Sequence, residues 1–209
     1  IERKDGKHVV FRDYFGHNVI KPPKENYMVP TIHVVPSGIR FMDGTRIPWA
    51  NRVTALTQNE EYMHTVSMLA AAYAARGHKV LVVSDRVQFL KNCAQLTGDD
   101  TICVTGEVPH EERESLTNQI LHGTKNVLFG TQAIFSEGIS IDNLSCLILG
   151  TPINNEPLLT QLIGRVIRKQ EKKLSPVVVD IHLLGNTAKR QASNRVGYYM
   201  KQGWEMKYI

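Results

Sequence analysis

Short apolar runs alternate with segments of helical periodicity from residue 59 to residue 200, and this alternation limits the possible folds more than any other feature. Buried parallel strands are continuously apolar because helices cover both faces of their sheet, and a helix connects each strand to the next. The sequence therefore predicts an α/β fold with a mostly parallel sheet covered by helices on both faces. The expected strands are KVLVVS (79–84), TICVTG (101–106), NVLFGT (126–131), LSCLILGT (144–151) and PVVVDIHLL (176–184).

Helices are expected between these runs, at residues 59–76, 85–96, 109–121, 156–168 and 187–200. Ser84 and Asp85 can cap the second of them. Upstream, residues 1–30 are polar and rich in proline, which predicts connecting chain. Residues 31–35 are a β-branched strand candidate, and residues 39–41 are expected to return as its hairpin partner.

The composition is ordinary for a soluble globular protein, with 42% hydrophobic and 22% charged residues, and no apolar run approaches the roughly 20 residues of a membrane span. Three cysteines stand singly in apolar runs, so we expect reduced core residues and a cytoplasmic protein. The histidines lack ligand spacing, and no metal site is predicted. A formal charge of +5 is compatible with a polyanionic partner but is weak evidence for one.

The predicted helix at residues 156–168 carries two arginines on its polar side. At about 100° per residue, aliphatic side chains fill one half of the helical wheel, and Gln161, Gly164, Arg165 and Arg168 share the other. A glycine inside a helix costs ~1 kcal/mol relative to alanine, which indicates that something large approaches there. Two guanidinium groups can hold phosphate oxygens in forked geometry. An amphipathic helix with a solvated arginine face is the alternative interpretation.

Small polar residues follow the carboxyl ends of four predicted strands, at the edge where ligands collect in a parallel sheet. The turns are 84–86, 105–107, 130–132 and 150–151; each contains serine or threonine, and three contain glycine. Turns are generally rich in these residues. Four of them on one edge nevertheless favour a phosphate-binding surface, because exposed amides and hydroxyls suit phosphate groups.

In their order along the chain, these segments resemble the motifs of superfamily 2 helicases. KVLVVSDR is similar to motif IV, TQAIFSEGISIDNLSCLIL to motif V and QLIGRVIR to motif VI. TICVTGEVPHEER is similar to the strand, threonine-glycine turn and helix that follow motif IV, and ERKDG to the segment after motif III. The resemblance covers nearly the whole chain and is strongest to the UvsW-like phage DNA helicases, in which motif V also reads G-I-S.

This resemblance implies a RecA-like three-layer domain, the second of two motor domains that use ATP with Mg²⁺ to move on DNA. Gln161, Arg165 and Arg168 match the catalytic positions of motif VI, and an arginine finger can raise the rate ~10³- to 10⁵-fold. The positions that approach the nucleotide are Glu137, Gly138, Ser140 and Gly164. The positions that face the nucleic-acid backbone are Arg86, Thr105, Gly106, Thr131 and Gln132.

Motif V departs from the family pattern at one position. Most superfamily 2 proteins place aspartate after G-I, where this chain has Ser140. The resemblance therefore does not predict a carboxylate contact to the ribose or to a motif VI arginine, and we do not assign that role to Asp142.

Half of an ATPase site is expected to lie outside this chain. No phosphate loop occurs, because Gly6-Lys7 is followed by His8, and no Asp-Glu pair follows a strand to hold Mg²⁺. We expect a first RecA-like domain to precede Ile1 and to bind most of the ATP and Mg²⁺. The predicted parts of this chain are an interdomain link with a lead-in strand or hairpin at 1–47, the second RecA-like domain at 48–186 and a basic helical extension at 187–209.

We expect a monomer that binds the DNA backbone without sequence preference, has no membrane partner and acts in the host cytoplasm if phage-encoded. Two alternatives stay open: the motor domain of a restriction enzyme or RNA helicase, and a non-catalytic nucleic-acid-binding module of the same fold. In the extension, five cations can add to DNA binding, and packing is the expected role of three aromatic residues. The cations are Lys189, Arg190, Arg195, Lys201 and Lys207, and the aromatics are Tyr198, Tyr199 and Trp204.

Overall fold

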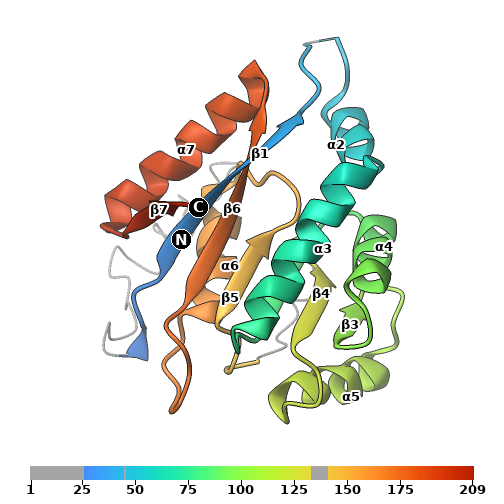
Figure 1. Cartoon of the computed structure of the whole chain (residues 1–209), viewed down its shortest axis with the longest axis vertical. Coiled ribbons are helices and arrows are strands. Elements are labelled where there is room, and N and C mark those ends of the chain that lie inside the picture. Colours follow the sequence, from blue (N-terminus) through green and yellow to red (C-terminus); the bar gives the residue numbers. More distant parts are fainter. Residues whose placement is uncertain (1–25, 45, 133–140) are drawn as a thin grey trace, which may run out of the picture.

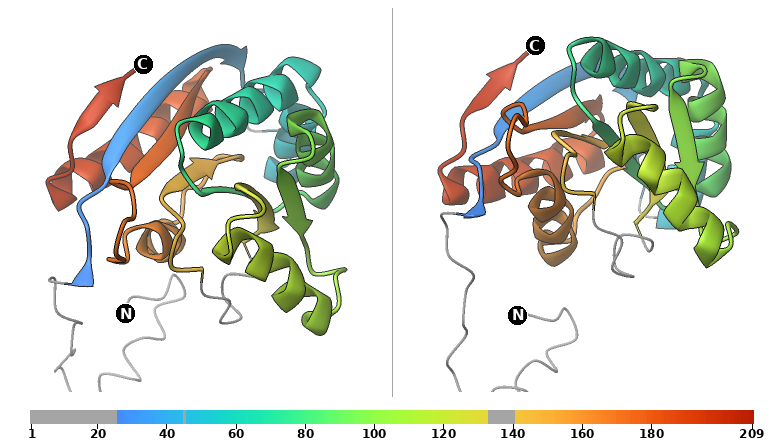
Figure 2. Two further views of the ribbon diagram at one scale, coloured as in Figure 1. Left: turned by 60° about the horizontal axis from the view of Figure 1, so that its bottom comes forward. Right: turned by 90° about the horizontal axis from the view of Figure 1, so that it is seen from below.

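The computed structural model describes residues 26–44, 46–132 and 141–209, which form a seven-stranded sheet between two layers of helices (Figures 1 and 2). Strand order is β3-β4-β2-β5-β6-β1-β7, and every neighbouring pair is parallel. The strands are β1 Thr31–Arg40, β2 Val80–Ser84, β3 Thr101–Val104, β4 Val127–Thr131, β5 Cys146–Leu149, β6 Val177–Leu184 and β7 Met206–Tyr208. The helices are α2 Trp49–Thr57, α3 Glu60–Ala75, α4 Val87–Thr97, α5 His110–Leu121, α6 Glu156–Val166 and α7 Asn186–Gln202.

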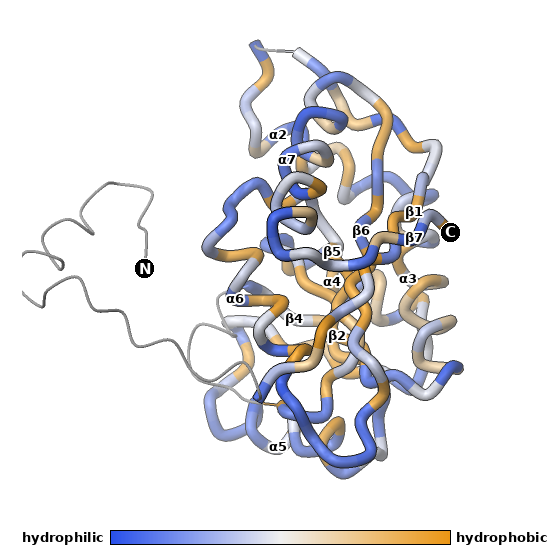
Figure 3. Tube along the Cα trace, turned by 90° about the vertical axis from the view of Figure 1, so that its left-hand side faces the viewer, coloured by the Kyte–Doolittle hydropathy of each residue, from blue (hydrophilic) through white to orange (hydrophobic). Residues whose placement is uncertain are grey.

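The central strands are buried on both faces. Every residue of β2, β4 and β5 is buried, which is why these strands are continuously apolar in the sequence. Helices α2, α3 and α4 pack on one face of the sheet, and α5, α6 and the C-terminal part of α7 pack on the other. Figure 3 shows the resulting distribution, with hydrophobic residues concentrated in the strands at the middle of the molecule. The predicted α/β fold is confirmed, with a sheet that is parallel throughout its described strands.

The predicted hairpin near the start of the described chain is wrong. Residues 31–40 form the single strand β1, which runs parallel to β6 from the pair Thr31 and Val177 to the pair Arg40 and Leu184. An irregularity between Pro36 and Arg40 holds the Ser37-Gly38 dipeptide that had indicated a turn, and Gly38 takes a positive φ of 71°. The extra residues are absorbed as a β-bulge, so the chain kinks without reversing.

Two elements were not predicted. Helix α2 follows Pro48 without a side-chain cap, so it lacks a start signal in the sequence. Strand β7 has three residues and adds to the outer edge of β1, where Ile32 pairs with Met206. Its pairing brings the end of the chain back onto the sheet, beside the strand that opens the described part.

Two predicted helix ends also need correction. Helix α6 ends at Val166, and Ile167 is its C-cap, so Arg168 lies beyond the helix and not on the same helical stripe as Arg165. The N-cap of α4 is Arg86, which has no side-chain cap bond. Ser84 instead accepts a hydrogen bond from the Arg86 backbone amide at 3.1 Å, forming a local turn before the helix.

Helix α7 is fixed to the sheet by a buried ion pair. Arg195 is 5% exposed and donates from Nε and Nη2 to both carboxylate oxygens of Asp180 on β6, at 2.7–3.1 Å. Tyr199 donates to the same carboxylate at 3.1 Å, and Tyr198 and Tyr199 pack with Trp204. Packing is thus confirmed for the three aromatics. Arg195 is unavailable to nucleic acid, contrary to its predicted contribution, because its guanidinium is committed inside the protein.

Candidate nucleotide and nucleic-acid sites

The predicted site residues divide between opposite edges of the sheet. All strands point the same way, so Arg86, Thr105 and Thr131, which follow or end β2, β3 and β4, lie at the carboxyl edge. Helix α6 runs back from that edge, and Arg168 beyond its end meets Asp142, which precedes β5, at the amino edge. Three predicted nucleotide-site residues, Glu137, Gly138 and Ser140, lie outside the described residues.

An ion pair that sequence reasoning did not assign joins the two motifs at the amino edge. Arg168 Nη1 donates to Asp142 Oδ1 at 3.0 Å, and both side chains are about half exposed. Asp142, to which the sequence analysis did not assign this role, therefore supplies a carboxylate contact to a motif VI arginine. Because this pair is open to solvent, its free energy is on the order of 0–1 kcal/mol, and a phosphate can compete for the arginine.

Arg165 lies in the last turn of α6, next to its final residue, and is half-buried. Burial lowers the pKa of its guanidinium and the charge of Arg168 lowers it further, whereas Asp142 opposes this shift. Arginine nonetheless keeps its proton. Two cations held together with partial loss of water would both be stabilised by an added anion, which is the property that a phosphate site needs.

Gly164 leaves the backbone of α6 accessible beside these arginines. A Cβ atom built at this position would meet no described atom within 4 Å, so packing inside the described chain does not require glycine. The residue is partly buried, and Gln161, one turn earlier, is exposed. Approach of a ligand or another domain to this helix therefore stays a prediction, since glycine costs ~1 kcal/mol relative to alanine inside a helix.

The segment that enters the domain pairs with the backbone around Arg168. Tyr27 and Arg168 form an isolated antiparallel bridge. The Met28 amide donates to the Ile167 carbonyl at 2.7 Å, and the Lys169 amide donates to the Asn26 carbonyl at 2.9 Å. These bonds end the helix and fix the direction of the chain that carries Arg168.

At the carboxyl edge, two threonine hydroxyls are covered by the protein. Thr105 is 1% exposed and Thr131 is 8% exposed, and neither Oγ1 has a hydrogen-bond partner among the described residues. An unpaired buried hydroxyl costs about 1–3 kcal/mol. Gly106 is exposed, so it and the neighbouring backbone form the accessible part of this predicted nucleic-acid surface.

Two arginines shape the same edge. Arg86 Nη2 donates to the Ala50 carbonyl at 3.3 Å, and its Nε lies 3.5 Å from Asp85. Arg113, which sequence reasoning missed, donates to the carbonyls of Val108 at 2.6 Å and Gly106 at 3.0 Å. Arg113 therefore fixes the threonine-glycine turn, and its place in the first half of a predicted helix gave no signal for that role.

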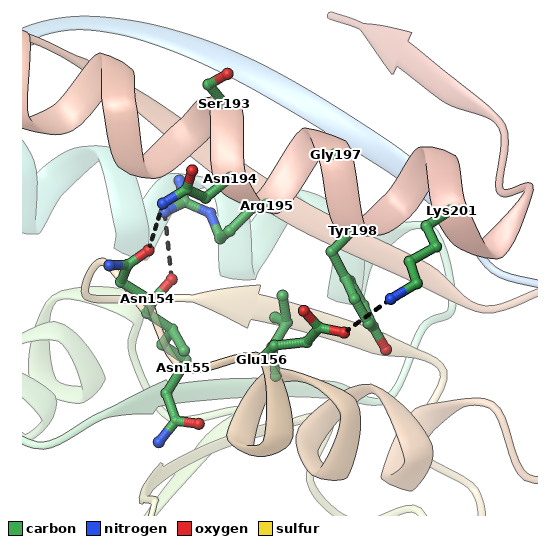
Figure 4. Close-up of a pocket in the computed structure, with 11 residues that line it drawn as sticks. Asn154, Asn155, Glu156, Ser193, Asn194, Arg195, Gly197, Tyr198 and Lys201 are labelled. Atoms are coloured by element: carbon green, nitrogen blue, oxygen red, sulfur yellow. Dashed lines mark hydrogen bonds and ion pairs between the residues drawn. The ribbon is translucent and has the colours of Figure 1, made fainter. Parts of the chain in front are cut away.

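A cavity of about 140 Å³ lies where several strand ends converge, and it places Gln132 with Asp85 and Thr151. It adjoins a larger groove of about 490 Å³ between the start of α6 and α7, and the two share Ile153, Asn154 and Asn155 (Figure 4).

An amide pair and an ion pair cross the larger groove. Asn194 donates to Asn154 at 3.1 Å, and Lys201 lies 4.0 Å from Glu156 (Figure 4). Amides, a cation and a carboxylate thus face solvent beside the strand ends.

Within residues 26–44, 46–132 and 141–209, no group of three or more His, Cys, Asp or Glu side chains is arranged to hold a metal ion. No described helix is both long enough and apolar enough to cross a membrane.

Residues 61–170 match the family described as helicase conserved C-terminal domain. The probable helicase D10 of Escherichia phage T5 is 42% identical over 208 residues, which cover 98% of this chain and 46% of that protein. The ATP-dependent DNA helicase uvsW of Enterobacteria phage T4 is 24% identical over 159 residues, covering 72% of this chain and 31% of that protein. The chain spans less than half the length of these curated relatives.

Solved structures share the fold. The T4 UvsW structure superposes with a TM-score of 0.68 at 20% identity, covering 86% of this chain and 41% of that one. The structure of Saccharomyces cerevisiae Dbp5 bound to RNA and ADP BeF3 has a TM-score of 0.64 at 13% identity, covering 100% of this chain and 49% of that one. At these identities the likeness concerns the fold alone.

Proposed function

The chain belongs to the helicase conserved C-terminal domain family of superfamily 2, and from this premise we propose that it is the second motor domain of an ATP-dependent DNA helicase or translocase. The predicted family and the RecA-like fold are confirmed. The activity of the longer protein, its DNA substrate and the roles of individual residues belong to the proposal.

The arrangement of Arg165, Arg168 and Asp142 at the end of α6 supports this proposal most directly. Two guanidinium groups lie together next to a helix backbone that is open at Gly164, and Arg168 pairs with the exposed carboxylate of Asp142. Such a cluster can exchange a carboxylate for a phosphate group at little cost, because an exposed ion pair is worth at most about 1 kcal/mol.

We assign the two arginines to the γ-phosphate of ATP. A first RecA-like domain would hold most of the nucleotide together with Mg²⁺, and α6 would present its arginines from across the interdomain cleft. Negative charge that develops on the transferred phosphoryl group is then met by fixed cations that need no rearrangement during the reaction.

Nucleic acid is assigned to the carboxyl edge, at the opposite side of the sheet. Gly106, Arg86 and Gln132 offer backbone amides, a cation and an amide there, which contact phosphates without reading bases. If the nucleotide and the nucleic acid bind at separate edges of the sheet, closure of the interdomain cleft on ATP can change how tightly the domain holds the nucleic acid, as a motor requires.

DNA is the proposed substrate because the T4 relative is named as a DNA helicase. RNA is the competing substrate, since the fold is shared with a protein solved with RNA. The motor domain of a restriction enzyme and a non-catalytic nucleic-acid-binding module are the remaining alternative functions.

The test is ATP hydrolysis by the full-length protein from which this chain derives, with single-stranded DNA, duplex DNA or RNA added. We expect hydrolysis that DNA stimulates more than RNA does, and no measurable hydrolysis by the 209-residue chain alone. Stimulation by RNA only would make the protein an RNA motor. Nucleic-acid binding with no hydrolysis under any condition would indicate the non-catalytic module.

A further inference from the structure

The side chain of Lys173 joins the two backbone segments that carry the Arg168 and Asp142 pair. Its Nζ donates to the Arg168 carbonyl at 2.7 Å and to the Asp142 carbonyl at 2.9 Å. Lys173 itself lies in the connection between α6 and β6 and is half-buried. One ammonium group thus holds the segment after α6 against the segment before β5.

These contacts fix what the exposed ion pair cannot fix alone. An arginine and an aspartate that are both about half exposed form a weak ion pair, which their long side chains can leave readily. The two hydrogen bonds of the half-buried Lys173 ammonium end on backbone carbonyls, so they hold the main chain itself. Each is charge-assisted and therefore stronger than a neutral hydrogen bond. The spacing between the Arg168 and Asp142 backbones is thereby set before a ligand arrives.

The connection is shaped to place this ammonium. Lys172 takes a positive φ of 60°, the one such non-glycine residue described, and the Lys173 amide donates back to the Gln170 carbonyl at 3.4 Å. The left-handed region is unfavourable for a non-glycine residue, so the surrounding contacts must hold the turn in this conformation.

We propose that Lys173 is a positioning residue for ATP hydrolysis, which holds the Arg168 backbone against that of Asp142 and so aims the Arg168 guanidinium into the nucleotide cleft. This inference rests on the proposed function, because it assumes that Arg168 meets the γ-phosphate. Lys173 acts through Arg168 and is not assigned any contact with the nucleotide.

The charge of Lys173 makes this role sensitive to pH. Burial lowers the pKa of Lys173 to about 8, with Asp142 opposing the shift and Arg168 adding to it. The other charged groups at this site are Lys79, across a cavity of about 170 Å³, and Glu171 and Lys172 on the same connection. The ammonium is present at neutral pH and is lost as pH rises through about 8, leaving a neutral amine that donates more weakly.

Deprotonation of Lys173 at alkaline pH is expected to lower activity without lowering the stability of the fold. The folded pKa of Lys173 lies below its ordinary value of 10.5, so the unfolded chain binds more protons between about pH 8 and 10.5. The contribution of Lys173 to the free energy of unfolding therefore rises over that range. Titration of Lys173 therefore does not unfold the chain over that range, and a fall in kcat caused by Lys173 would come from the weakened contacts of its amine.

The experiment measures kcat and KM for ATP in the full-length protein with saturating nucleic acid. The variants are Lys173→Met, Lys173→Arg, the exposed neighbour control Lys172→Met, Arg168→Ala and the double variant of Arg168→Ala with Lys173→Met. We expect Lys173→Met to lower kcat roughly 10- to 100-fold with KM nearly unchanged, as a displacement of about 1 Å can do. Lys172→Met should stay within about twofold of the parent protein, and the double variant should be no slower than Arg168→Ala, because both changes remove one function.

The pH profile supplies the second measurement. The kcat of the parent protein should fall between about pH 7 and 9, and Lys173→Arg should lose that fall because arginine keeps its proton. A Lys173→Met variant with normal kcat overturns the inference, as does a parent profile that stays flat over this range if Lys173→Met fails to fold. Normal kcat in Arg168→Ala would instead refute the proposed function.

Discussion

Replacement of Arg195 by methionine tests how the described core holds α7. Methionine keeps most of the side-chain volume and removes the charge, so Asp180 is left as a carboxylate that is 1% exposed, with Tyr199 at 3.1 Å and His182 at 3.6 Å as its remaining partners. Removing one partner of a buried ion pair costs about 3–5 kcal/mol. We expect a loss of this size in the free energy of unfolding of the 209-residue chain, measured by urea denaturation and circular dichroism.

The same variant should reverse the dependence of stability on acid. Burial acts to raise the pKa of Asp180, but Arg195 and His182 hold it at about 2, below its ordinary 3.8. The pair therefore adds about 2 kcal/mol of stability above pH 4, which is lost as pH falls toward 2. In Arg195→Met burial acts without Arg195, so the pKa of Asp180 rises and moderate acid stabilises the variant relative to neutral pH.

The matched control on α7 is Lys201→Met, which removes the exposed, 4.0 Å pair with Glu156 at the start of α6. Its free energy of unfolding should change by less than about 0.5 kcal/mol. An Arg195→Met variant that loses less than about 1 kcal/mol, or that keeps the parent response to acid, would refute the reasoning about the buried pair.

Two further predictions concern the proposed sites. Gly164→Ala should raise the free energy of unfolding of the chain by up to ~1 kcal/mol, because alanine favours the helix and its Cβ meets no described atom within 4 Å. The same variant should slow ATP hydrolysis in the full-length protein if a ligand or domain approaches the helix at this position. Gly150→Ala is its control in stability assays and should destabilise the chain, because the new Cβ would lie 2.9 Å from the Val83 carbonyl. If Gly164→Ala did not raise the free energy of unfolding, the inference that the backbone at Gly164 is open would be wrong. The affinity of the full-length protein for random-sequence DNA, measured by fluorescence anisotropy over a salt series, should fall steeply with salt. In Arg86→Ala the dependence of affinity on salt should be shallower, and an unchanged dependence would show that Arg86 does not contact the DNA backbone.

The sheet was predictable because its strands are buried on both faces and therefore stand out as apolar runs. The same logic failed at β1, where Ser37-Gly38 carries the local signal of a turn but the pairing with β6 absorbs it as a bulge. Strand β7 has three residues, two of them exposed, and α2 has no side-chain cap, so neither had a local signature. Local patterns thus identified the core and missed elements whose position depends on tertiary pairing.

The candidate site shows the same limit. The resemblance selected Arg165 and Arg168, and the structure places both near the end of α6. The pairing of Arg168 with Asp142 joins residues 26 positions apart, and the Lys173 contact joins residues 31 apart, so neither follows from helical or strand spacing. Burial of the Thr105 and Thr131 hydroxyls also depends on neighbouring elements, which a motif match does not report.

The most direct test of the central claim is single-turnover ATP hydrolysis by the full-length protein and its Arg165→Ala and Arg168→Ala variants, with nucleic-acid affinity measured on the same samples. If these arginines serve the γ-phosphate, each variant should hydrolyse ATP slower by roughly 10³-fold or more, Lys substitutions should restore little, and nucleic-acid affinity without nucleotide should stay within about twofold. Variants that hydrolyse ATP at the parent rate while losing nucleic-acid affinity would show that the end of α6 faces the strand and would contradict the account.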